Sequence, residues 1–113
     1  MNNLSLLKDF PSDFKFGVAT SSYQIEGNAY GNCGKSIWDD FAQRRLNGVN
    51  GKKACNHYSF YKEDIKLIKE AGFKAYRFSF AWPRLFPEND NQINQDGVDF
   101  YHRLLDEINS NDL

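Results

Sequence analysis

The stretch that decides the fold is F-K-F-G-V-A-T-S-S-Y-Q-I-E-G, residues Phe14–Gly27. Its first half alternates with a period of two, so that Phe14, Phe16 and Val18 share one face and smaller or polar residues share the other. This pattern predicts a β-strand over 14–20 with one bulky and one small face. The strand passes directly into a dense run of hydrogen-bonding side chains, which is typical of the loops at strand carboxyl ends that carry the chemistry of α/β proteins.

Three further elements follow from periodicity. Apolar residues recur at spacings of three and four over 56–71 and 95–109, which predicts two amphipathic helices. Asn56 and Asn94 precede these helices and are predicted to cap them. Between the helices, residues 75–81 alternate aromatic with small or polar side chains and predict a second strand. A helix between two strands favours a parallel β-α-β arrangement, whose sheet is buried on both faces.

The connection over residues 21–55 shows no sustained periodicity and is expected to be a long βα loop. Its apolar island, Ser36–Phe41, contains Trp38, whose side chain requires a place to pack, so we expect the loop to be ordered. In the second strand, Arg77 falls on the small face, which lines the interior of a barrel with helices outside. A guanidinium keeps its charge, so Arg77 needs an anionic partner there, and the neighbouring sequence offers none.

Composition excludes some classes of function. The 113 residues carry a net charge of −1, so electrostatics give no case for binding nucleic acid or acidic membranes. The N-terminus has no features of a signal peptide or membrane span, and we expect a cytoplasmic protein. Cys33 and Cys55 lack metal-ligand spacing and are expected to be free thiols, with a disulfide between them as the alternative.

Few residues offer catalytic chemistry by type and spacing. No phosphate-binding glycine loop is present, and His57 and His102 are expected to be ordinary helix residues. Gln24 is the sharpest candidate, because an amide offers donors and an acceptor to a pair of sugar hydroxyls, although a loop glutamine is more often solvated or bonded to backbone. For Glu26, capping a loop or pairing with an arginine is favoured over an acid/base role.

Five blocks, in order along nearly the whole chain, closely resemble the glycoside hydrolase family 1 β-glycosidases. The blocks are F-P-S-D-F-K-F-G-V-A-T-S-S-Y-Q-I-E-G (10–27), G-K-S-I-W-D-D-F (34–41), H-Y-S-F-Y-K-E-D-I-K-L-I-K-E-A-G (57–72), Y-R-F-S-F-A-W-P-R-L-F-P (76–87) and N-Q-D-G-V-D-F-Y (94–101).

The resemblance implies a retaining β-glycosidase on a (β/α)8 barrel, in which an acid/base and a nucleophilic carboxylate act through a covalent glycosyl-enzyme. It implies that Gln24 binds substrate hydroxyls and that Arg77 supports the nucleophile, which would supply the missing anion. Trp38 and Trp82 match family positions near the site, where packing is at least as plausible a role as contact with sugar. The implied partner is a β-glucoside or oligosaccharide, and the family requires no metal or organic cofactor.

The chain departs from the family pattern in what it lacks. The N-E-P motif of the acid/base, the E-N-G motif of the nucleophile and the H-W motif after strand three do not occur in it. We therefore expect residues 1–113 to form the first two βα units of the barrel and to be inactive alone, with the remaining barrel in the same or another chain. The alternative is an inactive fragment that associates with copies of itself through open strands.

Overall fold

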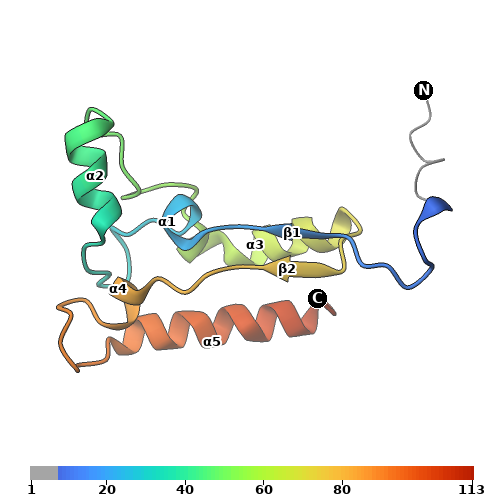
Figure 1. The fold of residues 1–113 in the computed structure, drawn as a ribbon. Helices are drawn as coiled ribbons and strands as arrows, with labels where there is room; N and C mark the ends of the chain where they lie inside the picture. Colours follow the sequence, from blue (N-terminus) through green and yellow to red (C-terminus); the bar gives the residue numbers. More distant parts are fainter. Residues whose placement is uncertain (1–7) are drawn as a thin grey trace.

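The computed structural model describes residues 8–113. Residues 1–7, which belong to the segment 1–113 expected to form the first two βα units, lie outside the described residues. Figure 1 shows the elements, which are, in chain order, β1 (Gly17–Ala19), α1 (Ser22–Ile25), α2 (Ile37–Arg45), α3 (His57–Glu70), β2 (Ala75–Arg77), α4 (Trp82–Leu85) and α5 (Gln95–Ser110).

The two strands run side by side and parallel, as the intervening helix predicts (Figure 1). Gly17 lies opposite Ala75 and Ala19 lies opposite Arg77. Two flanking hydrogen bonds extend the pairing, since the Lys74 amide donates to the Phe16 carbonyl and the Thr20 amide donates to the Arg77 carbonyl, each at 2.9 Å. The order β1, α3, β2, α5 is thus two parallel strands, each followed by a long helix.

Both strands are shorter than predicted. The expected strand over 14–20 is reduced to Gly17–Ala19, and the expected strand over 75–81 is reduced to Ala75–Arg77. Alternation of side chains reports which residues can lie extended, whereas a strand also needs a hydrogen-bonded neighbour. In the described part of the chain each strand has one neighbour, and the two overlap over only these three residue pairs.

The core lies between α3, α5 and one face of the sheet. Its buried side chains are Tyr61 and Ile65 of α3 with Phe100, Tyr101, Leu104 and Ile108 of α5. Tyr76 and Phe78 pack against this cluster, so the aromatic face of the second strand meets the helices, as expected. Residues of the opposite face, including Gly17, Ala19 and Arg77, are exposed.

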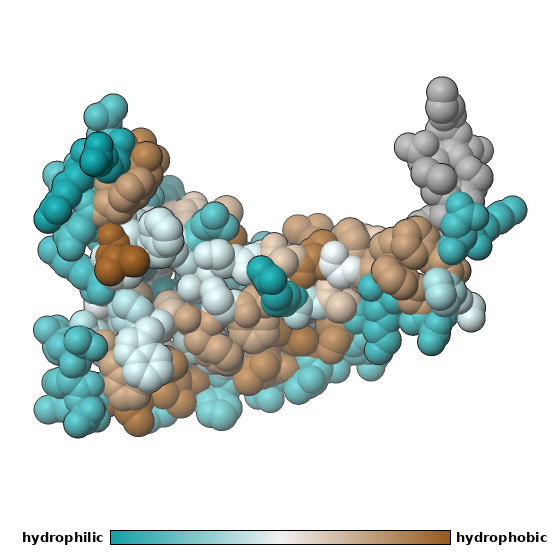
Figure 2. Space-filling view, in the orientation of Figure 1, coloured by the Kyte–Doolittle hydropathy of each residue, from teal (hydrophilic) through white to brown (hydrophobic). Residues whose placement is uncertain are grey.

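The aromatic face of the first strand departs from expectation. Phe14 and Phe16 are 48% and 39% exposed and cluster with Phe10, with ring centroids 4.7 to 5.1 Å apart. These rings pack on one another at the amino-terminal end of β1, because the chain there lies beyond the β1–β2 ladder. Figure 2 shows apolar colour running along the sheet and continuing to this end of the molecule.

The expected loop over 21–55 contains two short helices, α1 and α2. The start of α2 carries a capping box, in which Ser36 Oγ accepts a hydrogen bond from the Trp38 amide at 3.2 Å and Asp39 Oδ2 accepts one from the Ser36 amide at 2.8 Å. This S-x-x-D signal is present in the sequence, but the mostly polar composition of α2 hides its period.

The two long helices begin and end within one residue of the predicted bounds, but the predicted caps are wrong. Asn56 adopts a left-handed conformation with φ 52° and makes no capping bond. The Asn94 side chain instead donates hydrogen bonds to the carbonyls of Gly31 and Arg84, at 2.8 and 2.9 Å, and joins three segments. Within residues 8–113, no helix is long and apolar enough to cross a membrane.

Candidate functional site

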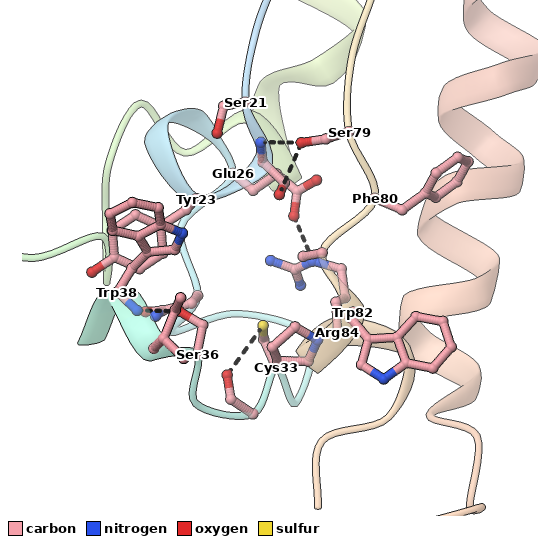
Figure 3. Close-up of a pocket in the computed structure, with 16 residues that line it drawn as sticks. Ser21, Tyr23, Glu26, Cys33, Ser36, Trp38, Ser79, Phe80, Trp82 and Arg84 are labelled. Atoms are coloured by element: carbon pink, nitrogen blue, oxygen red, sulfur yellow. Dashed lines mark hydrogen bonds and ion pairs between the residues drawn. The ribbon is translucent and has the colours of Figure 1, made fainter. Parts of the chain in front are cut away.

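The carboxyl ends of β1 and β2 open onto a pocket of about 280 Å³ (Figure 3). Segments far apart in the sequence line it with hydroxyl groups and aromatic rings. Its lining includes Ser22 and Tyr23 of α1, Ser36 at the start of α2, Trp38 of α2, Ser79 after β2 and Trp82 of α4. Serine hydroxyls beside aromatic faces are suited to polyhydroxylated ligands.

A buried ion pair forms part of the lining of this pocket. Arg84 is fully buried, and its Nε donates a hydrogen bond to Glu26 Oε2 at 2.8 Å (Figure 3). The other guanidinium nitrogens donate to the carbonyls of Tyr30 at 2.8 Å and Gly27 at 3.1 Å. All three nitrogens are therefore hydrogen-bonded, which is what a buried guanidinium requires. The expectation that Glu26 has a structural role, such as pairing with an arginine, is confirmed.

Aromatic side chains enclose the pair. The Arg84 guanidinium lies 4.6 Å from the ring centroid of Tyr58 and 5.5 Å from that of Phe100. The Tyr101 hydroxyl donates to Glu26 Oε1 at 2.9 Å. Burial, reinforced by the Glu26 carboxylate, raises the pKa of Tyr101 far above its ordinary value.

Of the predicted site residues, the structure brings the two tryptophans to one pocket. Trp38 and Trp82 are about half exposed and line it from opposite sides of the Glu26–Arg84 pair (Figure 3). Gln24 lies on α1 and is exposed, and Arg77 is the exposed last residue of β2. Neither Gln24 nor Arg77 belongs to the lining of this pocket.

Arg77 has no ion-pair partner among residues 8–113. Its position on the exposed sheet face is the one from which a barrel strand projects a side chain inward. The anionic partner expected for it in a barrel is thus not supplied by the described chain.

The histidines and cysteines differ in exposure, from buried His57 to exposed His102 and Cys55. His57 is the first residue of α3, a helix residue as expected; it is buried, and its Nδ1 lies 2.7 Å from Asp64 Oδ2 on the same helix. His102 is exposed on α5. Cys33 and Cys55 are free thiols, as expected, and burial raises the pKa of Cys33, which borders the pocket. The described residues contain no cluster of three His, Cys, Asp or Glu side chains able to hold a metal ion.

Sequence reasoning missed Arg84, which organises the site. The residue stands in the apolar segment W-P-R-L-F, where a charge suggests burial with a partner. Its partner is 58 residues away in the sequence, and no local pattern links the two.

A parallel β-α-β segment with a polar and aromatic pocket at its strand carboxyl ends is the architecture of α/β barrel enzymes. The family model of glycosyl hydrolase family 1 matches residues 6–113. The chain belongs to glycosyl hydrolase family 1, whose known structures are (β/α)8 barrels.

Individual relatives agree with this assignment. β-Glucosidase A of Acetivibrio thermocellus is 55% identical over 100 residues, which cover 84% of this chain and 22% of that protein. β-Glucosidase A of Thermotoga maritima is 48% identical over 106 residues, covering 90% of this chain and 24% of that protein.

Among solved structures, virulence factor SghA of Agrobacterium tumefaciens, in complex with its substrate analog salicin, matches with a TM-score of 0.91 and 45% identity. The match covers 97% of this chain and 25% of that one. The chain thus spans about a quarter of the length of the relatives it matches.

Proposed function

We propose that this chain forms the first two βα units of the barrel of a retaining β-glycosidase that hydrolyses β-D-glucosides or related sugars. The observation that carries the proposal is the parallel pairing of β1 with β2, which directs residues 20–26 and 77–84 to the same end of the sheet. In a parallel barrel that end carries the active site.

Within the proposed enzyme, Gln24 binds hydroxyls of the substrate sugar through its amide. Arg77 lies beside the nucleophilic carboxylate, where its positive charge holds the carboxylate ionised by lowering its pKa. Retaining glycosidases place two carboxyl groups about 5 to 5.5 Å apart, one as nucleophile and one as acid/base. Because the N-E-P and E-N-G motifs are absent from residues 1–113, both carboxylates come from the remaining barrel, in the same or another polypeptide.

The exposed face of the sheet supports the proposal that further parts of a barrel cover it. Small side chains or none at Gly17, Ala19 and Ala75 leave one face of β1 and β2 open, and parallel sheets are ordinarily covered on both faces. The outer edges of the two strands also lack a strand partner in residues 8–113. These open edges equally favour a second candidate, an inactive chain that pairs with copies of itself.

A cytoplasmic location of the protein stays a prediction.

The test is to compare the chain alone with a chimera in which it replaces the matching part of Acetivibrio thermocellus β-glucosidase A. We expect the chimera to hydrolyse an aryl β-glucoside and the 113-residue chain to be inactive. Native mass spectrometry of the chain alone then separates a single 13.1 kDa species from a self-associated one. A folded chimera without activity, or activity of the chain alone, would contradict the proposal.

A further inference from the structure

We propose that Arg84 is a positioning residue for Gln24 and that it acts through Glu26. The inference rests on the proposed function, because it assumes that Gln24 contacts the substrate. According to this inference, the buried Glu26–Arg84 ion pair fixes the position of the Gln24 side-chain amide after the end of β1.

The helix that carries Gln24 has little to hold it by itself. α1 is four residues long, Ser22–Ile25, and none of its residues is buried. A single helical turn is not stable on its own, because nucleation costs more than one turn of hydrogen bonds returns. The orientation of α1 therefore depends on what its two ends and its Tyr23 side chain are tied to.

The first end is tied to the segment after β2 by exposed hydrogen bonds. The Ser22 amide donates to Ser79 Oγ at 2.9 Å, and Ser79 Oγ donates to Ser22 Oγ at 3.2 Å. Tyr23 contributes one further link, since its hydroxyl accepts a bond from the Gly51 amide at 3.1 Å. Exposed bonds such as the Ser22–Ser79 pair compete with water and hold the helix weakly.

The second end is tied by the buried pair. Glu26 directly follows α1 and caps its carboxyl end, and its amide donates to the Ser22 carbonyl at 2.9 Å. Both of its carboxylate oxygens are used, one by Arg84 and the other by Tyr101. Because Arg84 is fixed by two loop carbonyls and two aromatic rings, the pair is a rigid anchor located two residues from Gln24.

The anchor also links the two strand ends to each other. Arg84 belongs to α4, which follows β2, whereas Glu26 follows β1. Their contact therefore sets the position of Gln24 relative to the segment that begins at Arg77. A hydrogen bond weakens steeply when its distance and angle depart from the ideal, so a fixed relation between these segments matters for how tightly Gln24 holds the sugar.

The first arm of the test uses the full chain and needs no activity. Amide hydrogen exchange is measured in the wild type, in Arg84→Lys, which keeps the charge but not the guanidinium fork, and in the milder Tyr101→Phe. We expect the amides of Gln24 and Glu26 to lose about tenfold or more in protection, while the Ile65 amide in α3 changes little. Equal losses at all three amides, or none at Gln24 and Glu26, would overturn the inference.

The second arm uses the active chimera and asks whether Arg84 acts through Gln24. Arg84→Lys should raise KM for an aryl β-glucoside about tenfold with kcat nearly unchanged, and should have no further effect when Gln24 is already alanine. Ile108→Ala, a core change far along α5, is the control for lost stability and should leave KM unchanged. The inference would be overturned if Arg84→Lys still raised KM about tenfold in a chimera that already carries Gln24→Ala. An increase of KM in Ile108→Ala would overturn it as well.

The two arms separate two kinds of failure. A chimera in which Gln24→Ala leaves KM and kcat unchanged contradicts the proposed sugar contact of Gln24, and with it the positioning role. Selective loss of protection in α1 would then still show that the anchor exists. Unchanged exchange in α1, together with a normal effect of Gln24→Ala on KM, contradicts the anchor alone.

Discussion

The hydroxyl of Tyr101 donates a hydrogen bond to Glu26 Oε1 at 2.9 Å and accepts one from the Ala81 amide at 2.6 Å. One phenol on α5 thereby contacts both the residue that follows α1 and the residue that precedes α4. Ionised Tyr101 would place a negative charge next to the Glu26 carboxylate in a buried setting. Burial of the phenol, and secondly the Glu26 carboxylate beside it, therefore raise the pKa of Tyr101 on folding.

This contact makes stability sensitive to alkaline pH. The unfolded chain releases the Tyr101 proton near its ordinary pKa of 10.0, whereas the folded chain retains it. The contribution of protonated Tyr101 to the free energy of unfolding is thus fully present below about pH 10. Above that pH it falls by up to about 1.4 kcal/mol per pH unit. Burial raises the pKa of Tyr76 as well, so the wild type should lose stability through both tyrosines.

We expect the unfolding free energy of Tyr101→Phe to fall less steeply with pH than that of the wild type, because only Tyr76 then remains to contribute to the slope. The measurement is urea unfolding of both proteins at several pH values between about 9 and 11. The phenylalanine variant also loses its hydrogen bonds at every pH, so the difference in slope is the readout, not the difference in stability at one pH. Parallel curves for the two proteins would show that Tyr101 does not retain its proton on folding.

The Glu26–Arg84 pair should be worth far more than an exposed one. Arg84→Met leaves the Glu26 carboxylate buried without its cation, and breaking a buried pair in this way costs about 3 to 5 kcal/mol. The control is Lys66→Ala, which removes an exposed pair with Glu70 at 3.7 Å and should cost less than about 1 kcal/mol. Urea denaturation measures both, and similar losses in the two variants would mean that burial of the Arg84 pair is incomplete in solution.

Local patterns in the sequence predict the two long helices and the presence of both strands. The stripes of α3 and α5 and the alternation around Val18 and Tyr76 are visible within single segments, and the structure has helices and strands there. The strand lengths could not be predicted in this way, because the extent of a ladder depends on its partner. α2 was missed because its capping signal, Ser36 with Asp39, opens a helix with little apolar periodicity.

The site shows the same division between local and distant information. The sequence indicates that Glu26 serves a structural role, but the choice of Arg84 as its partner depends on how α4 packs against the loop at residues 27–30. Asn94 illustrates the converse error. Its position before α5 predicts a cap, yet its amide bonds to carbonyls of two other segments, a choice made by tertiary packing.

Gly97 provides a steric test of the packing of α5 on α4. A Cβ at this buried position would overlap the backbone carbonyl of Arg84, which cannot easily move. Alanine favours a helix over glycine by about 1 kcal/mol, but the overlap costs about 1 to 3 kcal/mol and should prevail. We expect Gly97→Ala to lower the unfolding free energy and exposed Asp106→Ala, on the same helix, to leave it nearly unchanged. A stabilised Gly97→Ala protein would show that α4 and α5 are not in contact at this point.

The last prediction concerns Arg77 and rests on the proposed function. In the active chimera, Arg77→Ala should reduce kcat by about a hundredfold or more, because the nucleophilic carboxylate loses the cation that keeps it ionised and oriented. KM should change little, since the sugar contact of Gln24 lies on another segment. Arg77→Lys should recover part of kcat, because it restores the charge without the planar fork. Steady-state kinetics on an aryl β-glucoside measure both variants, with exposed Arg103→Ala as the matched loss of charge. Normal turnover in Arg77→Ala would refute the role proposed for this arginine.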